Sequence, residues 1–321
     1  MSDLDGACVL ITGGTGFIGR RLVETLRAAG AEVTVADQDP YPDSDVRSVV
    51  GDLRDPAVRE AAVAPGLDAI VHLAAMTSVL RSMEDPAGVY RLNVDVTADL
   101  LERARLRGVP RFVLASTNAV TGDVGATPIN ERTPPRPLTP YGATKAAAEM
   151  LLSAYTGAYG MLTCALRFAN VYGPGMQHKD SFVPRLMRAA ATGTGVRVYG
   201  DGTQLRDYVH VDDVVQAVTL AWRTDHLGPL VVGSGRSTSV NDLIEAARAV
   251  TGAPIPARFT AAKQGEMPAV VLDISAARRL GYRPHHDLAS GLATVWPEFA
   301  PAAAPPDPVS AGSAPDSVGA S

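Results

Sequence analysis

The sequence predicts an α/β protein in which a doubly wound parallel β-sheet carries helices on both faces and is joined to a smaller, interleaved α/β domain. Three observations predict this fold. Short runs rich in β-branched residues alternate with longer segments of helical period. Several of these runs are apolar continuously rather than at every second position, as in strands buried on both faces. With 321 residues the chain is also long enough for two domains.

The first half of the chain alternates strand and helix patterns. We expect buried strands at residues 8–11, 32–36, 69–73, 111–115 and 162–166, with a further short strand just before Asp52. We expect helices at residues 17–29, 56–63, 89–107 and 141–159. Helices of this length suit right-handed crossovers between parallel strands, so the pattern indicates a doubly wound sheet.

After Phe168 the pattern becomes irregular, because clusters of glycine and proline separate short elements. Helices are expected there at residues 212–223 and 240–251. We assign residues 1–169 and about 207–225 to the large domain, and about 170–206 and 226–298 to the smaller one. Residues 299–321 are rich in Ala, Pro, Ser and Gly, so we expect them to form a disordered tail.

The composition excludes several classes of protein. Hydrophobic residues make up 46% of the chain and charged residues 20%, which is typical of a globular body with a packed core. The net charge of −5, with both signs interspersed, argues against nucleic acid as a partner. The chain has no run of about 18 apolar residues and no basic, apolar leader at its start. We therefore expect no membrane partner and a cytoplasmic location.

Cysteine is rare in this sequence. Cys8 and Cys164 both lie inside apolar runs, and we expect both to be buried free thiols. Two such cysteines make neither a disulfide framework nor a metal-ligand pattern, so we expect no metal site.

A glycine-rich segment lies between the first expected strand and the first expected helix. Gly13, Gly16 and Gly19 suit a tight turn, a close approach of the backbone to a pyrophosphate, and close packing of the helix on the sheet. The helix N-terminus, which includes Phe17 and Ile18, would face the negative charge. The segment therefore predicts a dinucleotide site.

Residues at the carboxyl ends of the other strands extend this prediction. Asp37 ends the second strand, where a carboxylate accepts hydrogen bonds from an adenosine ribose. A carboxylate there repels the 2′-phosphate of NADP, so the sequence favours NAD. The cofactor crevice is expected to be lined further by Asp52, Leu53, Leu73, Ala74 and Ala75.

Tyr141 and Lys145 open another expected helix, four residues apart and therefore on one face. A phenol is a poor base at neutral pH because its reference pKa is about 10. A nearby ammonium and a cationic nicotinamide ring would favour the phenolate. This pair therefore predicts a general base beside the cofactor.

Taken together, the motifs resemble a known family. The chain is similar to the extended short-chain dehydrogenases/reductases, and specifically to the NAD-dependent sugar-nucleotide epimerase/dehydratases such as the UDP-glucose 4-epimerases. The resemblance spans about residues 7–295. It includes the motifs above and, further along, the segments at residues 72–75, 167–174, 199–202, 206–213 and 232–235.

The resemblance implies roles for particular residues. Tyr141 would be the catalytic base, Lys145 would lower its pKa and bind the nicotinamide ribose, and Thr117 would hold the sugar O4. The Rossmann domain would bind NAD with the residues already named and with Asn93, Ser116 and Phe168. The substrate would be a UDP- or dTDP-linked sugar, and the residues that would bind it are Thr117, Asn170, Val183, Arg206 and Lys263. A homodimer would form through the helices near 89–107 and 141–159.

Some positions depart from the family pattern. Asn118 and Ala119 stand where the 4,6-dehydratases carry Asp-Glu and the uronate decarboxylases carry Glu, so the acid-base step of both reactions lacks its carboxylate. Lys263 stands where an Arg is usual, and a Lys neutralises phosphate without a bidentate contact. We expect structural roles for the histidines His72 and His210, and a place near the sugar pocket for His178.

These residues predict a nucleoside-diphosphate-sugar 4-epimerase. It would oxidise the sugar at C4, let the 4-keto sugar rotate, and return the hydride to the other face. A 4-keto sugar-nucleotide reductase that consumes NAD(P)H is the first alternative, followed by a dehydratase or decarboxylase. A non-enzymatic sensor of NAD or sugar nucleotide is the remaining one.

Overall fold

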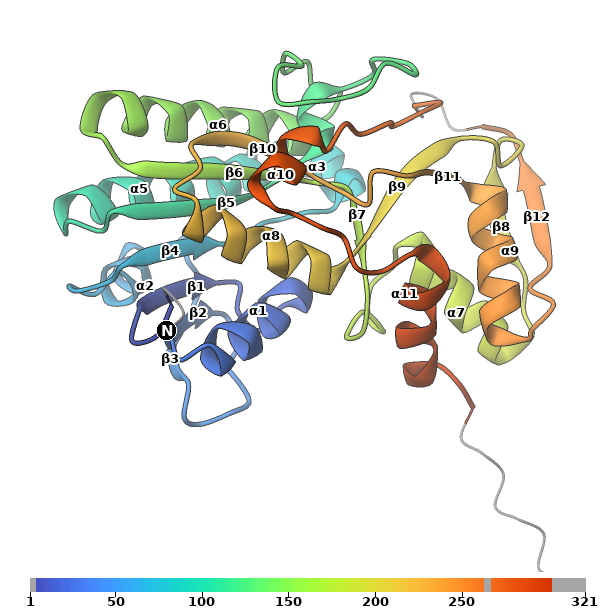
Figure 1. Ribbon diagram of the computed structural model, residues 1–321, viewed down its shortest axis with the longest axis horizontal. Helices are drawn as coiled ribbons and strands as arrows, with labels where there is room; N and C mark the ends of the chain where they lie inside the picture. Colours follow the sequence, from blue (N-terminus) through green and yellow to red (C-terminus); the bar gives the residue numbers. More distant parts are fainter. Residues whose placement is uncertain (1–3, 263–266, 302–321) are drawn as a thin grey trace, which may run out of the picture.

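A computed structural model of the chain describes residues 4–262 and 267–301. Lys263 and nearly all of the expected tail lie outside the described residues. Figure 1 shows a larger domain built around one sheet and, beside it, a smaller domain of short strands and helices. No helix in the described ranges is long and apolar enough to cross a bilayer.

The large domain contains a seven-stranded sheet in the order β10-β6-β5-β4-β1-β2-β3, and every neighbouring pair in it is parallel. Its strands are β1 (Cys8–Thr12), β2 (Glu32–Asp37), β3 (Arg47–Val50), β4 (Ala69–His72), β5 (Arg111–Thr117), β6 (Leu162–Phe168) and β10 (Gly228–Val232). The continuously apolar strands are central, where both faces are covered. The predicted doubly wound fold is confirmed.

Helices cover both faces of this sheet. α1 (Phe17–Ala28) and α8 (Val211–Arg223) pack on one face, and α2 (Pro56–Ala62), α5 (Val96–Leu106) and α6 (Pro140–Tyr159) pack on the other (Figure 1). Neighbouring residues of β1 point into different cores, because Val9 and Ile11 join the first cluster and Leu10 joins the second.

The helix expected at residues 89–107 has a different form. α3 (Val79–Glu84) and α4 (Pro86–Tyr90) precede a π-helical turn at Arg91–Asp95, and α5 follows that turn directly. A π-helical turn inserts an extra residue into a helix and often marks a functional region. Here it carries Asn93 on its buried side.

The small domain has its own core. It contains a three-stranded sheet of β11 (Ser237–Ser239), β9 (Leu205–His210) and β7 (Asn170–Tyr172), and a pair of strands, β12 (Ala257–Thr260) and β8 (Val196–Tyr199). The helices α7 (Phe182–Thr192), α9 (Val240–Thr251) and α11 (Leu288–Val295) pack with them. Short 3-10 turns complete the described elements at Asn118–Thr121 and Trp296–Glu298.

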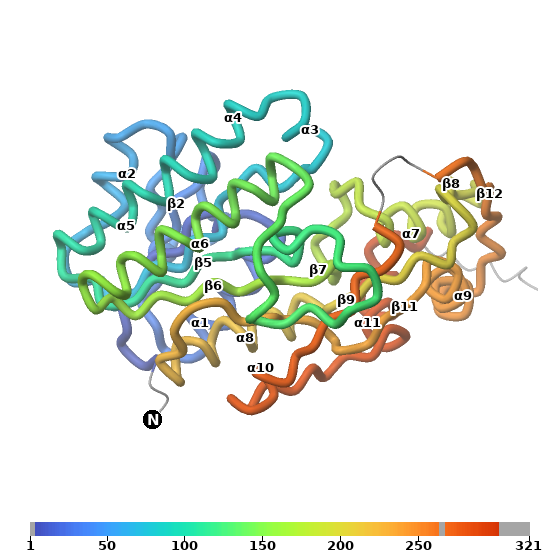
Figure 2. Tube along the Cα trace, turned by 90° about the horizontal axis from the view of Figure 1, so that it is seen from above, coloured from blue at the N-terminus to red at the C-terminus, as the bar shows by residue number. Residues whose placement is uncertain are grey.

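The expected domain division is wrong in three places. β10 lies in the range expected for the small domain, yet it pairs with β6 and forms one edge of the large sheet. α10 (Ser275–Leu280) contacts β10 and lies near α8 in Figure 2, and its Ala277 is buried in a large-domain core. Conversely, residues 207–210 belong to β9 and thus to the small sheet. The chain crosses between domains more often than composition reveals.

The two thiols also differ from each other. Cys164 is buried, as expected, but Cys8 is only half-buried. It is the first residue of β1 and lies opposite Glu32 on β2. Burial and the carboxylates of Glu32 and Asp68 raise the pKa of Cys8, which makes it a poor nucleophile.

Candidate active site

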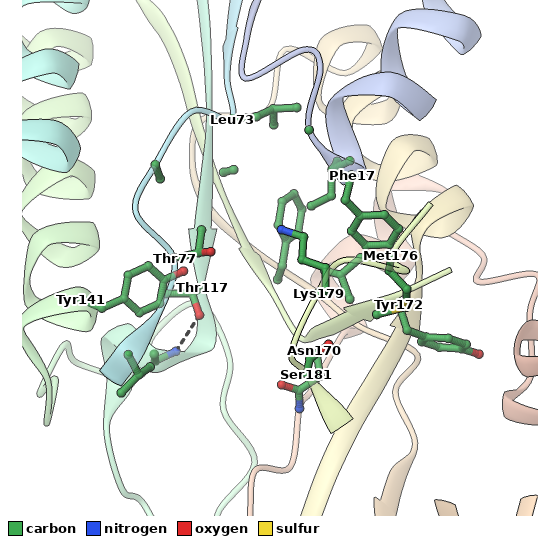
Figure 3. Close-up of a pocket in the computed structure, with 18 of the residues that line it drawn as sticks. Phe17, Leu73, Thr77, Thr117, Tyr141, Asn170, Tyr172, Met176, Lys179 and Ser181 are labelled. Atoms are coloured by element: carbon green, nitrogen blue, oxygen red, sulfur yellow. Dashed lines mark hydrogen bonds between the residues drawn. The ribbon is translucent and has the colours of Figure 1, made fainter. Parts of the chain in front are cut away.

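A cavity of about 870 Å³ lies between the two domains. Its large-domain wall consists of the carboxyl ends of β1, β2, β4, β5 and β6, where ligands bind in doubly wound sheets. Its other wall comes from β7, β8, β9 and the loop before α7. Figure 3 shows side chains from both walls that point into this space.

The glycine-rich turn after β1 needs its glycines. Gly13 has φ +74°, and a Cβ there would lie 2.7 Å from the backbone nitrogen of Ala74. A Cβ at Gly19 would lie 2.1 Å from the carbonyl oxygen of Gly13. The first turn of α1 has no side-chain cap and no acidic residue, so its N–H groups face the cavity and suit a pyrophosphate.

Asp37 lies where an adenosine ribose would bind. It ends β2, lines the cavity, and accepts hydrogen bonds from the backbone N–H groups of Thr15 (3.0 Å) and Gln38 (2.7 Å). These contacts orient the carboxylate and tie it to the glycine-rich turn. The geometry and the donor set therefore fit an NAD molecule whose pyrophosphate lies at α1 and whose ribose lies at Asp37.

Most of the other expected cofactor residues meet in the same cavity. Those that line it are Gly16, Phe17, Ile18, Asp52, Leu53, Leu73, Ala74, Ala75, Ser116 and Phe168. Asp52 is paired with Arg54, which lowers the pKa of that carboxyl.

Asn93 corrects one expectation, because the structure places it behind the cavity wall and not in it. Its side-chain amide accepts a hydrogen bond from the Met76 N–H (2.9 Å) and donates to the Met76 carbonyl (3.1 Å) and to Thr144 (3.1 Å). Buried in the π-helical turn, Asn93 ties the loop after β4 to α6. It therefore supports the wall that the loop provides.

Tyr141, Lys145 and Thr117 come together at the centre of the large-domain wall. α6 begins at Pro140 with the Thr139 side chain as its cap, and this places Tyr141 and Lys145 on its first two turns, facing β5. Thr117 is the last residue of β5 and pairs in register with Phe168. The Tyr141 side chain lies near Thr117, and both line the cavity (Figure 3).

Burial dominates the electrostatics of this group. It raises the pKa of Tyr141 to about 12, and the neighbouring Thr117 hydroxyl acts in the opposite direction. Burial lowers the pKa of Lys145 to about 8, while the nearby Glu149 raises it. At neutral pH Lys145 therefore keeps its positive charge next to the phenol, as a general base of this type requires.

Glu149 is a residue that sequence reasoning missed. It lies one turn after Lys145 on α6, and its carboxylate accepts hydrogen bonds from Ser116 (2.5 Å) and from the guanidinium of Arg167 (2.7 Å). Ser116 and Arg167 are register partners on β5 and β6, which explains why they meet. The signal in the sequence was the four-residue spacing from Lys145.

The two buried histidines have structural roles, as expected. His72 Nδ1 lies 2.7 Å from the hydroxyl of Thr12, its register partner on β1, and Nε2 lies 3.1 Å from that of Thr97. His210 Nδ1 accepts a hydrogen bond from the Asp212 N–H (3.2 Å). Burial lowers the pKa of His72 to about 3 and that of His210 to about 4, so both are neutral at pH 7.

His210, Asp212 and His286 lie close enough together to hold a metal ion. The charges around them do not favour one, because the Arg21 guanidinium already pairs with Asp212 at 2.5 Å. The three residues also meet at the N-terminus of α8, where the helix dipole repels cations. We therefore assign no metal site to this cluster.

On the small-domain wall, Asn170, Val183 and Arg206 line the cavity as expected for substrate residues. Lys263 lies outside the described residues. His178 is exposed and does not line the cavity, whereas its neighbour Lys179 does. No pattern in the sequence distinguishes these two neighbours.

Comparisons with known proteins agree with this geometry. A sequence model of the NAD dependent epimerase/dehydratase family matches residues 9–233. The UDP-glucose 4-epimerase of Corynebacterium glutamicum is 32% identical over 90% of this chain and 94% of its own length. The dTDP-glucose 4,6-dehydratase of Streptomyces griseus is 33% identical over 89% of this chain and 92% of its own. A solved structure of MoeE5 in complex with UDP-glucuronic acid and NAD has 38% sequence identity and a TM-score of 0.83, and it covers 91% of this chain and 99% of that one.

Proposed function

Because the chain belongs to the NAD-dependent epimerase/dehydratase family, we propose that it is a nucleoside-diphosphate-sugar 4-epimerase. The observation that carries this proposal is the placing of Thr117, Tyr141 and Lys145 on one wall of a cavity that also fits NAD. Bound NAD would supply the reversible hydride transfer at C4 of the sugar.

The residues of the chain supply the proton chemistry. Tyr141 takes the proton from the 4-hydroxyl group of the sugar, and the Lys145 cation stabilises the phenolate that does so. The Thr117 hydroxyl, next to Tyr141, orients the sugar oxygen between them. Asn170 and Arg206 on the opposite wall bind the nucleotide diphosphate, so that the sugar can turn and present its other face.

The lining of the cavity argues against elimination. The 3-10 turn after Thr117 begins with Asn118 and Ala119, which carry no acid. Among the described residues that line the cavity, the carboxylates are Asp37 and Asp52, and both lie on the cofactor side. A 4,6-dehydratase of this family uses a carboxyl group beside C5 and C6 of the sugar, and the described wall offers no carboxylate there.

The proposal is tested by incubating the purified protein with UDP- and dTDP-linked hexoses in deuterated water, without reduced cofactor, and following the sugar protons by NMR. Interconversion of 4-epimers with retention of the C4 hydrogen would support it. Deuterium at C5 or C6 would indicate a dehydratase. Turnover that starts only after NAD(P)H is added would indicate the reductase.

Tyr141→Phe provides the matching variant. Loss of general-base catalysis should reduce turnover by about 10²- to 10⁴-fold. Tyr155→Phe is the control, because Tyr155 lies on the same helix but outside the cavity, where it donates to Glu102. Full turnover by Tyr141→Phe would reject Tyr141 as the base. If Tyr141→Ala left all biological function in place, the sensor alternative would replace the enzyme.

We also propose a homodimer that forms through α5 and α6. The helices that adjoin α6 carry exposed apolar side chains, including Leu80, Met83 and Tyr90, and Met150 is exposed on α6 itself. Light scattering of the wild type and of Met150→Glu tests this, since a charge in a dimer interface should yield monomers. The cytoplasmic location expected from the sequence stays a prediction.

A further inference from the structure

Lys179 lies in the loop between β7 and α7 and lines the cavity. Its side chain is half-buried, and in Figure 3 the ammonium end points across the cavity toward the wall that carries Thr117 and Tyr141. Within residues 4–262 and 267–301, no hydrogen bond or ion pair of this ammonium is found. The cation is thus aimed at the space where the sugar would react.

The loop holds Lys179 in this position. The Lys179 N–H donates to the Met176 carbonyl at 2.9 Å, which closes a tight turn. The guanidinium of Arg188, on α7, donates to the carbonyls of Gln177 (2.8 Å) and Lys179 (3.1 Å). A further hydrogen bond joins the Gly175 N–H to the Glu298 carboxylate at 2.7 Å. These contacts fix the backbone from which the Lys179 side chain extends.

A half-buried ammonium without a protein partner is costly. Burial lowers the pKa of Lys179, because the charged form loses contact with water. An anion on the bound ligand would remove this cost and would form a charge-assisted hydrogen bond. The position of Lys179 therefore calls for a negatively charged group in the middle of the cavity.

The phosphates of the ligands have other partners. The cofactor pyrophosphate has the N-terminus of α1, and the nucleotide diphosphate has Arg206 on β9 with Arg197 nearby on β8. Arg185, which also lines the cavity, is already paired with Asp180 at 2.6 Å. Lys179 is thus a cation beyond those that the diphosphate groups need, and a nucleotide with an uncharged sugar offers it no anion.

The sugar itself is the remaining place for an anion. Thr117 and Tyr141 define the position of C4, and C6 is attached to the neighbouring ring carbon, C5. A C6 carboxylate would therefore lie near the reacting centre, where it could meet an ammonium that points from the opposite wall. Lys145 and the oxidised nicotinamide ring are both positive there, so a carboxylate would also balance the local charge.

We propose that Lys179 binds the carboxylate of a uronic acid, so that the preferred substrate is a nucleoside-diphosphate hexuronate. This inference rests on the proposed function, because it uses the C4 position that Thr117 and Tyr141 define. Lys179 is then a specificity residue, and the carboxylate is neither attacked nor removed.

Lys179→Met tests the proposal in the holoenzyme. The value of kcat/KM is compared for UDP-glucuronate and UDP-glucose, and for the dTDP-linked pair. The wild type should prefer the uronate, and Lys179→Met should lose about 10- to 100-fold on the uronate only, as for one hydrogen bond to a charged group. Lys179→Arg should restore part of the preference. Arg258→Met is the control, because Arg258 is an exposed cation of the small domain outside the cavity.

Other outcomes overturn the proposal. An equal loss on uronate and hexose would mean that Lys179 contacts the diphosphate, and a loss confined to NAD affinity would mean that it contacts the cofactor. No change would mean that it contacts no ligand. Calorimetric binding of both sugars to wild type and Lys179→Met separates this test from the proposed function. Uronate-selective binding without turnover would reject the epimerase and keep the subsite, whereas epimerisation without uronate preference would do the reverse.

Discussion

Glu149 and Arg167 form an ion pair in the interior of the large domain, one helical turn from Lys145. The distance from Arg167 Nη2 to Glu149 Oε2 is 2.7 Å, and the two side chains are 3% and 4% exposed. The Ser116 hydroxyl donates to the same carboxylate at 2.5 Å. This network connects β5, β6 and α6 directly behind the proposed catalytic residues, and it places a negative charge where it supports the Lys145 cation.

Glu149→Gln should destabilise the protein by about 3–5 kcal/mol, because it leaves the Arg167 cation buried and unpaired. Urea unfolding followed by circular dichroism measures the change in the free energy of unfolding. Glu245→Gln is the control, since Glu245 pairs with Arg248 on the exposed face of α9. Equal unfolding midpoints for the two variants would mean that the buried pair does not stabilise this fold.

Much of the large domain could be predicted because its signals are local. Continuous apolar runs mark the central strands, and Gly13, Gly16 and Gly19 mark a turn whose close contacts tolerate no Cβ. The strands β5 and β6 nevertheless run two residues further than expected, to Thr117 and Phe168. Pairing with neighbouring strands extends them, and pairing depends on residues far away in the sequence.

The remainder depends on tertiary contacts. In the sequence, β10 is a short apolar run that would fit a strand in either domain. Its pairing with β6 is what assigns it to the large sheet. Asn93 resembles a cofactor residue by position, but the π-helical turn carries its amide to Met76 behind the wall. Lys179 and His178 are neighbours in an irregular loop, and hydrogen bonds to Arg188 decide which of them enters the cavity.

Lys145→Met should make the cofactor-free protein more stable at pH 7 while abolishing turnover. Burial lowers the pKa of Lys145 from 10.5 to about 8. The buried charge therefore destabilises the folded state relative to the unfolded state, in which Lys145 is solvated. A shift of this size corresponds to a gain on the order of 1–3 kcal/mol on removal of the charge.

The effect of Lys145 on the free energy of unfolding should depend on pH. Between about pH 8 and 10.5 the unfolded chain binds the Lys145 proton that the folded chain has released, so stability rises with pH through this window. Urea unfolding of wild type and Lys145→Met at pH 7, 9 and 10.5 measures it. The difference between the two proteins should shrink as pH rises, and a constant difference would refute the assignment to Lys145.

Gly19→Ala should abolish NAD binding and lower stability. The new Cβ would lie 2.1 Å from the Gly13 carbonyl oxygen and 2.6 Å from the Gly14 Cα, so α1 must move away from the turn. Gly157→Ala on α6 is the matched control, because its Cβ meets no atom within 4 Å. That change should stabilise α6 by up to about 1 kcal/mol. Fluorescence titration with NADH and thermal unfolding give both readouts, and normal NADH affinity in Gly19→Ala would contradict the proposed cofactor geometry.

His72 should make the protein sensitive to acid. Its pKa is about 3 in the folded state and 6.5 ordinarily, so between these values the unfolded state binds one more proton. Stability is therefore complete above about pH 6.5 and falls as pH decreases toward 3. The slope of the unfolding free energy against pH, measured between pH 4 and 6, gives the number of protons taken up on unfolding. This number should be smaller by about one in His72→Gln. Glutamine keeps a polar group for Thr12 and Thr97. An unchanged slope would mean that His72 is not buried in its neutral form.

Asp37→Asn should weaken the preference for NAD over NADP. The carboxylate of Asp37 is fixed by the N–H groups of Thr15 and Gln38, so its charge stands close to where a 2′-phosphate would lie. The amide keeps a similar shape and one acceptor oxygen for the ribose, and it removes the repulsion of the phosphate. Dissociation constants for NADH and NADPH, measured by fluorescence at low salt, should converge mainly through tighter NADPH binding. Asp39→Asn, two residues further along an exposed loop, controls for the change in net charge. If NADPH affinity stayed the same while NADH affinity fell, Asp37 would bind the ribose without selecting the cofactor.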